Sequence, residues 1–401
     1  MKKVLVDQAL EKGKGVLRLA PTWVPRAFCR PGRRLKLHPD DYFSLGLKRG
    51  GIDERWLSSA TPADNGPGTP GDEGLSYIVI DDDGKEKVML AEAVDLLGED
   101  LIGPQLWGKY GKWPMFSKFF DNLGPLPHHI HHRDRHAEKV GQAGKPEMYF
   151  FPAQMNNYPG EFAYTFFGFN PEVTKQQVRE CLMNFEKGDN HILELSRAYK
   201  LRVDTGWDVP PGVLHAPGSL CTYEPQFSSD VYAMYQSVLF ADHVTPPELL
   251  WKNMPESEYG NYDYLMDVID WERNIDPDFA QKHFMPPIRI NNRDEQPGLI
   301  EEWICYKCDQ VSAQRLTLYP DSSAVIKDEA AYGLILIQGH GSINGQIMET
   351  PSMIRYGQLT RDEFFVSHHA AKQGVTLVNN ALSEPLVLLK HFAENPEIPI
   401  T

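Results

Sequence analysis

The C-terminal third of the chain is a succession of short apolar segments, each bounded by turn-forming residues. Examples after Ile288 are RLTLYP, GLILIQ, EFFV, GVTLVNN and PLVLLKHF. Short segments of this kind, evenly spaced with turn signals between them, are typical of sandwiches and jelly rolls. The 31 Pro and 32 Gly among the 401 residues also favour many short elements joined by turns. We therefore predict a mainly β fold.

The length predicts two domains, because one hydrophobic core rarely organises 401 residues. Apolar residues at helical spacing predict short helices near 171–200 and 245–272, and a Pro-Pro pair follows the second stretch. We expect an N-terminal domain over 1–285 that includes these helices. The β-rich remainder, 286–401, is expected to form a second domain.

Charge and composition narrow the range of partners. A formal net charge of −15 does not suit a surface that neutralises phosphate backbones, so we expect no nucleic-acid partner. No window approaches the length of an apolar membrane span, and the first residues do not resemble a secretory signal. The 5 Cys are too few and too scattered for a disulfide framework. We expect a cytoplasmic protein without a membrane partner, and the sequence leaves its oligomeric state open.

The densest chemical signal lies in residues 126–151, which contain five histidines. Alternate side chains of a strand point to opposite faces, so His129 and His131 share one face and can chelate. Glu147 stands just ahead of the next predicted strand, and a hairpin would bring its carboxylate beside this pair. His215 follows a Pro-Pro-Gly turn. Three imidazoles and a carboxylate can hold a divalent transition metal with positions left for substrate.

For any one of these histidines, a strand that faces solvent or a local pairing is an equally good interpretation. The combination is more specific than its members. The order His-x-His, then Glu, then His after a Pro-Gly turn resembles the metal-binding cupin barrels, although the gap between His131 and Glu147 is longer than in the compact cupin motif.

Three further matches narrow this resemblance. Lys145-Pro-Glu-Met precedes a predicted strand, Lys118 in WPMFSKFF precedes His129 by eleven residues, and Glu224 follows His215 by nine. In these blocks and spacings, residues 52–237 resemble the type I phosphomannose isomerases, a zinc-dependent cupin group.

The resemblance implies tandem cupin barrels and a metal-dependent aldose–ketose isomerase that acts on a mannose-like sugar or sugar phosphate through an enediol. It implies that four residues bind the metal, namely His129, His131, Glu147 and His215. It implies that three more line the sugar pocket, namely Lys118, Lys145 and Glu224. One divalent transition metal is expected, with zinc favoured and manganese, iron or nickel compatible with the same ligands.

The sequence departs from the family at three positions. His129 stands where the family usually has glutamine, Met234 where it has an arginine, and Gln105 where it has a glutamate before Leu-Trp. The missing arginine removes a cation that could bind phosphate, so an unphosphorylated sugar or another sugar derivative becomes an alternative substrate.

Aldose–ketose interconversion needs a base near C1 and C2 and a positive centre for the developing oxyanion. A metal meets the second need, and Lys145, Glu224 and Lys118 are competing candidates for the first. The alternative interpretation of both lysines is that they lie at the surface, as most lysines do.

Two other functions remain open at this stage. A cupin oxygenase could use the same His3Glu centre with iron, and a non-catalytic carbohydrate-binding cupin would fit the loss at Met234. In the C-terminal domain the candidate ligands do not follow the cupin order, so we expect no metal there; they are Glu302, His340, His368, His369 and His391. The single Cys305-x-x-Cys308 pair is interpreted as structural.

Overall fold

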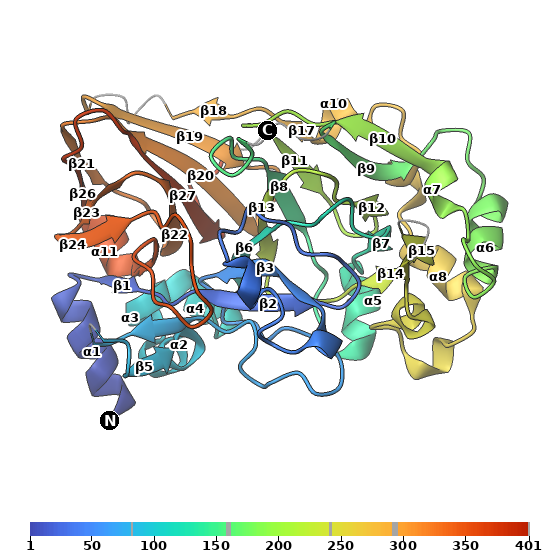
Figure 1. The fold of residues 1–401 in the computed structure, drawn as a ribbon, viewed down its shortest axis with the longest axis horizontal. Coiled ribbons are helices and arrows are strands. Elements are labelled where there is room, and N and C mark those ends of the chain that lie inside the picture. The colour runs from blue at the N-terminus through green and yellow to red at the C-terminus, as the bar shows by residue number, and fades with distance from the viewer. Residues whose placement is uncertain (82, 158–161, 240–242, 291–295, 400–401) are drawn as a thin grey trace.

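Four antiparallel sheets, arranged in layers, make up most of the molecule (Figure 1). The computed structural model describes residues 1–81, 83–157, 162–239, 243–290 and 296–399. Strands dominate and the helices are short, so the prediction of a mainly β fold is confirmed. None of the described helices is both long and apolar enough to cross a membrane.

Two of the four sheets are built from the first 285 residues. The inner N-terminal sheet has the order β17 (Phe284–Met285), β11 (Gly206–Val209), β8 (Glu147–Phe150), β13 (Thr222–Phe227), β6 (Met115–Phe120), β3 (Gly51–Leu57) and β2 (Thr22–Arg26). The outer N-terminal sheet has the order β10 (Ser196–Lys200), β9 (Tyr164–Phe169), β12 (His215–Ala216), β7 (His129–Ile130) and β14 (Ala233–Met234).

The other two sheets come almost entirely from the C-terminal part. The inner C-terminal sheet has the order β1 (Val16–Arg18), β25 (Glu363–Val366), β22 (Tyr332–Gln338), β27 (Leu386–Ala393), β20 (Val311–Leu318), β19 (Leu299–Cys305) and β18 (Ile288–Arg289). The outer C-terminal sheet has the order β21 (Ser322–Ile326), β26 (Val375–Asn379), β23 (His340–Ile343) and β24 (Gln346–Glu349). Strand β1 therefore joins the C-terminal sheets although it lies near the start of the chain, and the expected division at residue 285 remains a prediction.

The two inner sheets pack face to face, and each is covered on its other face by an outer sheet. Strand β22 shows how the sequence meets this demand. Its Ile335 and Ile337 belong to the core between the inner sheets, whereas Leu334 and Leu336 belong to the core against the outer C-terminal sheet. Because the strand is buried on both faces, it is a continuous apolar run rather than an alternating one.

Helices cover the outer N-terminal sheet on its far side, at the right of Figure 1. Ile130 of β7 and Ala233 of β14 pack there against α6 (Lys175–Met183) and α8 (Tyr262–Val268). The same region contains α7 (Ile192–Leu195) and α9 (Trp271–Asn274), whereas Phe279 of α10 (Phe279–His283) packs with Phe167 and Trp207 in the core between the N-terminal sheets. The helical stretch expected near 171–200 ends early, because its last five residues pair with β9 as strand β10.

A second group of helices, which the sequence analysis did not predict, closes the lower left of the molecule in Figure 1. These are α1 (Lys2–Lys12), α2 (Leu90–Leu97), α3 (Glu99–Ile102) and α4 (Pro104–Tyr110). Helices α2, α3 and α4 follow the hairpin of β4 (Tyr77–Val79) and β5 (Lys87–Met89) in the sequence. Together with α1, they pack on the core between the inner sheets. Two further helices are α5 (Asp134–Ala137) and α11 (His368–Gln373).

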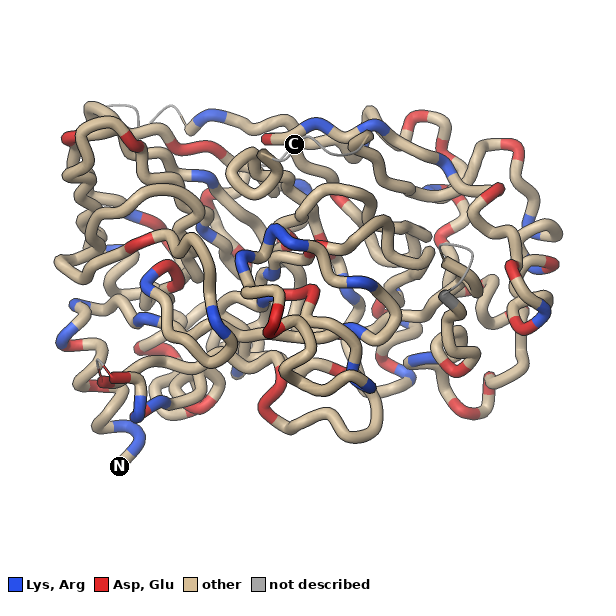
Figure 2. The backbone as a smooth tube through the Cα atoms, viewed as in Figure 1, with Lys and Arg blue, Asp and Glu red and all other residues tan. Residues whose placement is uncertain are grey.

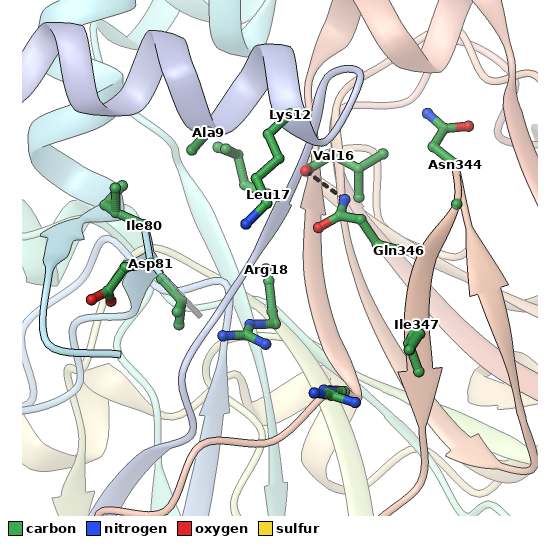
Figure 3. Close-up of a pocket in the computed structure, with 13 residues that line it drawn as sticks. Ala9, Lys12, Val16, Leu17, Arg18, Ile80, Asp81, Asn344, Gln346 and Ile347 are labelled. Atoms are coloured by element: carbon green, nitrogen blue, oxygen red, sulfur yellow. Dashed lines mark hydrogen bonds between the residues drawn. The ribbon is translucent and has the colours of Figure 1, made fainter. Parts of the chain in front are cut away.

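An open cavity of about 510 Å³ lies between α1, β1 and the β23–β24 hairpin (Figure 3). Its charged lining residues are Lys12, Arg18, Asp81 and Arg361. Basic and acidic residues are interspersed along the rest of the trace as well (Figure 2).

A buried ion cluster joins the two inner sheets. Arg55 of β3 donates to both oxygens of Asp362 at 2.8 and 2.9 Å and to Oε2 of Glu363 at 3.2 Å. The three side chains are nearly inaccessible to water. Removing one partner of a buried ion pair leaves an uncompensated charge in a medium that solvates it poorly.

Replacement of this arginine, Arg55→Ala, is expected to lower the free energy of unfolding by about 3–5 kcal/mol. The measurement is urea denaturation at neutral pH, followed by circular dichroism. The matched control is Arg179→Ala, which removes an exposed pair with Asp263 and is expected to change the free energy by less than about 1 kcal/mol. Equal effects of the two variants would contradict the role assigned to the buried cluster.

Candidate metal centre

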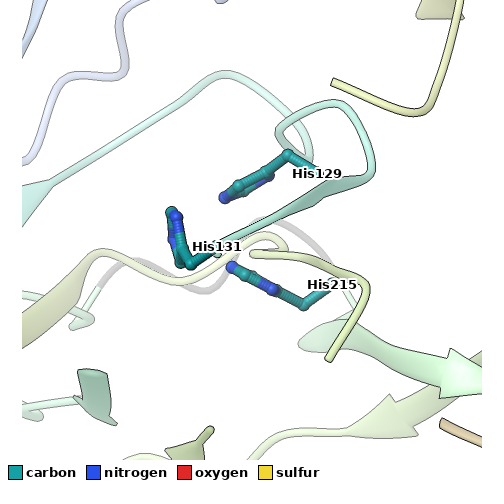
Figure 4. Close-up of side chains that lie close together, drawn as sticks. All are labelled: His129, His131 and His215. Atoms are coloured by element: carbon teal, nitrogen blue, oxygen red, sulfur yellow. The ribbon is translucent and has the colours of Figure 1, made fainter. Parts of the chain in front are cut away.

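Three buried histidines meet between the two N-terminal sheets (Figure 4). His129 on β7 and His215 on β12 are direct partners in the antiparallel register, and His131 follows two residues after His129 on the same side. The ring centroids are 4.2 Å apart for His129 and His215, and 5.0–5.1 Å apart for the other two pairs. One nitrogen of each ring lies within 4.8 Å of the others. The strand register thus places three imidazoles around one point.

The hydrogen bonds of these rings fix which nitrogen is protonated. Each ring donates its Nδ1–H to a backbone carbonyl oxygen, which can only accept: His129 to Pro127 at 2.8 Å, His131 to Val231 at 2.8 Å and His215 to Val213 at 2.9 Å. In the neutral form of each ring, Nδ1 therefore holds the proton and Nε2 carries the lone pair. Histidines that bind metals in proteins usually donate their other ring N–H to a carbonyl or carboxylate in this way, which fixes the orientation of the ring.

Glu147, the first residue of β8, lies beside two of the three histidines. Its Oε2 lies 3.0 Å from Nε2 of His131, and its Oε1 lies 3.1 Å from Nε2 of His215 and accepts from the Tyr149 hydroxyl at 2.7 Å. Oε2 of Glu147 and Nε2 of His215 are buried without a hydrogen bond. With the rings neutral, lone pairs face each other across these short distances.

Facing lone pairs repel one another unless a cation lies between them, and buried acceptors without partners cost about 1–3 kcal/mol each. Three imidazole nitrogens and one carboxylate oxygen are a donor set that suits zinc and also manganese, iron or nickel. The residues present therefore fit a divalent transition metal.

The titration of these groups favours metal binding at neutral pH. Burial lowers the pKa of His131 to about 4 and holds that of His129 well below its usual value. Burial alone would raise the pKa of Glu147, but His131 and Lys145 hold it well below its usual range. Protons therefore compete weakly for these ligand atoms.

Two lysines and a second glutamate lie beside the histidines. Glu224 on β13 is the register partner of Lys118 on β6, and its Oε1 lies 3.2 Å from Nζ of Lys118 and 3.8 Å from Nζ of Lys145. Lys145 Nζ also lies 3.2 Å from both Oε2 of Glu147 and Nε2 of His131. All three side chains are buried. The structure thus brings together the seven candidate residues named from the sequence.

Strand alternation explains why these charged groups share one face. On β6, Met115 and Phe119 belong to the core between the inner sheets, so Lys118 points to the opposite side. On β8, Met148 and Phe150 belong to that core, and Glu147 points away from it.

Three residues that the sequence analysis missed extend the cluster. Glu54 on β3 lies 3.3 Å from Lys118 through its Oε1, and its Oε2 lies 3.2 Å from Arg26 on β2. Arg26 in turn contacts Asp230 at 3.2 Å. No spacing motif marks these residues. The only available signal was the run Asp-Glu-Arg at 53–55 inside a strand, where a polar run needs buried partners.

The other histidines of the five-histidine segment lie elsewhere. His128 and His132 alternate with the candidate ligands and point away from them, His128 toward Gln236 and His132 toward the sulfur of Met254. His136 contacts the exposed Asp267 at 2.9 Å.

In the C-terminal part, Glu302 pairs with Arg315 and His391 contacts the Tyr223 hydroxyl. Among the described residues, the three histidines are the only group of three or more candidate side chains close enough to hold a metal. Cys305 and Cys308 are both free thiols.

Removal of one ligand, His215→Ala, is expected to weaken metal binding by more than about 100-fold. Loss of a group that only hydrogen-bonds a ligand typically costs about 10–100-fold in affinity. The measurement is the zinc content per chain after loading and desalting, by plasma mass spectrometry. His132→Leu is the matched control, since it removes a buried imidazole beside His131 that points the other way. Equal zinc contents in His215→Ala and the unchanged protein would contradict the site.

The metal-free protein is expected to lose stability as the pH falls below about 6.5. Burial lowers the pKa of four histidines, to about 4 in His128 and His131 and to about 3 in His132 and His391. Since the ordinary value is 6.5, the unfolded chain binds protons that the folded chain does not. Burial acts in the opposite sense on three carboxyls: it raises the pKa of Glu224 to about 8, that of Glu363 to about 7 and that of Asp53 well above its usual value.

With His129, five buried histidines outnumber these three carboxyls, so the free energy of unfolding should fall by about 1–3 kcal/mol per pH unit between pH 6.5 and 4.5. Thermal unfolding of the chelator-treated protein across this range measures the slope. A midpoint that does not change between pH 6.5 and 5 would show that the buried imidazoles do not control acid stability.

Comparison by sequence found no match to a known family or to a curated protein. Comparison of structures found extensive likeness. A mannose 6-phosphate isomerase from Bacillus subtilis superposes with a TM-score of 0.60 at 15% identity, over 94% of this chain and 99% of that one. A phosphomannose isomerase variant from Salmonella typhimurium gives a TM-score of 0.63 at 12% identity, over 95% of this chain and 100% of that one.

A mannose 6-phosphate isomerase bound with zinc and yttrium is similar to the same degree, with a TM-score of 0.62 at 12% identity, over 95% of this chain and 100% of that one. At these identities the likeness establishes the fold. The resemblance found in the sequence is therefore confirmed at that level: the chain has the fold of the mannose-6-phosphate isomerases.

Proposed function

We propose that this protein is a metal-dependent aldose–ketose isomerase that converts a mannose-like sugar through an enediol. The observation that carries the proposal is the meeting of a His3Glu donor set with a buried array of Lys118, Glu224 and Lys145. The first can hold a Lewis acid, and the second supplies a proton-transfer group flanked by cations. Both are what an enediol reaction needs.

The solved structures add support from another protein. Variants of the Salmonella typhimurium enzyme replace a lysine and the glutamate two residues after it, the separation of Lys145 and Glu147. Other variants replace a lysine and a histidine that are separated as Lys118 and His131 are. We infer that Lys118 and Lys145 line the sugar pocket here.

We also infer a tandem cupin architecture, with each outer sheet and its inner sheet forming one jelly-roll barrel and the division near residue 285. The metal would belong to the N-terminal barrel alone, held by His129, His131, Glu147 and His215. Zinc is favoured because a neighbour with this fold is bound with zinc. A metal held there would act as a Lewis acid toward the carbonyl and hydroxyl oxygens of the sugar.

Glu224 is the best-placed group for moving the proton between C1 and C2. Its buried Oε1 has no hydrogen bond of good geometry, although the two lysine ammonium groups lie 3.2 and 3.8 Å away. Burial, and then the charge of Glu147, raise the pKa of Glu224 to about 8. A carboxyl that can both take up and release a proton near neutral pH suits an enediol mechanism.

Lys118 is assigned the role of a fixed cation. Burial opposes its charge, but Glu224 and Glu54 together raise its pKa well above the usual value. The ammonium group therefore keeps its proton and can stabilise negative charge on an enediolate oxygen. Lys145, which touches Glu147, His131 and Glu224, links the sugar pocket to the ligand set.

These lysines also distinguish the isomerase from the oxygenase alternative. Dioxygen chemistry at a His3Glu centre does not call for an acid–base pair beside the metal, whereas proton transfer does. Lys118, Glu224 and Lys145 are buried, and burying charged groups costs free energy because they lose their hydration. That a cluster of such groups is present despite this cost supports a chemical role for it.

The test is proton NMR of zinc-loaded protein with mannose and mannose 6-phosphate, each in D2O. Ketose formation, with deuterium entry at C1 of the ketose and at C2 of the recovered aldose, is expected for at least one sugar. Oxygen uptake without ketose would favour the oxygenase, and retained metal without turnover of any aldose would favour a binding protein.

The variant Glu224→Gln keeps the shape of the side chain and removes its acid–base function, so the turnover number should fall by about 10²–10⁴-fold with zinc content unchanged. Glu302→Gln is the control, because this glutamate pairs with Arg315 in the C-terminal part. Full turnover in Glu224→Gln would remove this residue from the proton transfer.

A further inference from the structure

We infer that the substrate of this site is a neutral, unphosphorylated sugar. The inference rests on the proposed isomerase function and adds the class of sugar. Its basis is the balance of charges around the metal ligands and the apolar character of the strand beside His129.

Every basic side chain in contact with the cluster is already paired with carboxyl groups. Among the described residues these basic groups are Arg26, Lys118 and Lys145. Their carboxyl partners are Glu54, Glu147, Glu224 and Asp230, all buried. Each of the three cations thus already has a carboxyl partner within the chain.

Arg26 is the most extensively paired of the three. Its terminal nitrogens donate to both oxygens of Asp230 at 3.2–3.3 Å and to Asn65 at 2.8 Å, and one of them lies 3.2 Å from Glu54. At the edge of this group, Lys252 pairs with Asp64 at 2.8 Å. Both terminal nitrogens of the guanidinium group are therefore occupied, and only Nε is left without a hydrogen bond.

A phosphate dianion in a buried site needs cationic donors that are not already neutralised, because its desolvation is costly. Here it would instead approach carboxylates, and like charges at short range repel. Sugar hydroxyls have the opposite requirement. They donate hydrogen bonds to carboxylate oxygens, and charge-assisted bonds of this kind are among the stronger ones.

The strand next to His129 provides an apolar surface. Met234 on β14 is the register partner of His129, and Ala233 is the partner of Ile130. Ile130 and Ala233 belong to the core under the helices, so Met234 lies on the same side as His129. Met234 packs there with Phe28, Cys29, Leu126 and Tyr232. These side chains are buried, so they form an apolar wall beside His129, and the thioether of Met234 offers no hydrogen-bond donor to a phosphate.

The test compares mannose with mannose 6-phosphate in two measurements on the zinc-loaded protein. The first is the ratio of their kcat/KM values in the isomerase assay. The second is calorimetric titration with mannitol and mannitol 1-phosphate, which bind without turnover. We expect kcat/KM to be at least tenfold higher for mannose, and mannitol to bind at least as tightly as its phosphate. A preference for the phosphorylated member in either measurement would overturn the inference.

A charge placed on the apolar surface provides an independent check. Met234→Arg adds an unpaired cation beside His129, and Met234→Gln is the matched control of similar length without charge. The arginine variant is expected to raise the ratio of mannose 6-phosphate to mannose activity by at least tenfold over the glutamine variant. Should Met234→Arg fail to fold, Asp230→Asn frees Arg26 from one counter-charge and should shift the ratio in the same direction. An unchanged ratio in the folded variants would contradict the inference.

Failure of the proposed function looks different from failure of this inference. If neither sugar exchanges deuterium at C2, the isomerase proposal fails, and the titration still decides the class of ligand. Tighter binding of the mannitol phosphate, or no binding of either polyol, would then overturn the neutral-sugar inference.

Discussion

The inner N-terminal sheet is buried on both faces, and this constraint organises the rest of the site. One face of β6, β8 and β13 is apolar and packs on the inner C-terminal sheet. The other face carries Lys118, Glu147 and Glu224 into the space between the N-terminal sheets. Charges in such a place cannot be solvated by bulk water, so each must have a partner of opposite charge or bind a ligand.

That requirement accounts for the length of the ion cluster. Glu147 contacts Lys145, Lys145 contacts Glu224, and the chain of contacts continues through Lys118 and Glu54 to Arg26. Ion pairs therefore link β13 to β6, β6 to β3 and β3 to β2. At the other end, Oε2 of Glu147 and Nε2 of His215 are buried without a hydrogen bond, while Nε2 of His131 contacts the ammonium group of Lys145. Metal binding at this end would therefore also add to the stability of the fold.

Much of the site could be predicted from the sequence because its members are marked by short-range patterns. Strand alternation pairs His129 with His131, a Pro-Gly turn marks His215, and the spacing of Lys118 and Glu224 from those histidines follows the family resemblance. In each case the pattern spans a few residues and does not depend on the rest of the fold.

The features that were missed depend on long-range pairing. Glu54 and Arg26 meet Lys118 and Asp230 only because β2 and β3 take their particular places beside β6, and register of that kind has no local signal. The three-residue strand β1 is too short for a periodic pattern, and its partner β25 lies at the far end of the sequence. Strand β10 ends a stretch with helical spacing, where the open edge of β9 outweighed the local preference.

The C-terminal sheets show that the same layering does not by itself create a site. Lys390 on β27 is fully buried there, with its ammonium group 2.8 Å from Glu301 and 3.0 Å from Asp328. Here the buried carboxylates are neutralised by a lysine of the same chain, so they do not need an external cation. In the N-terminal sheets the corresponding acceptors include three imidazole lone pairs, and the nearest cations are already bound to glutamates. The proposed metal site therefore depends on which buried acceptors the chain leaves without an internal cation.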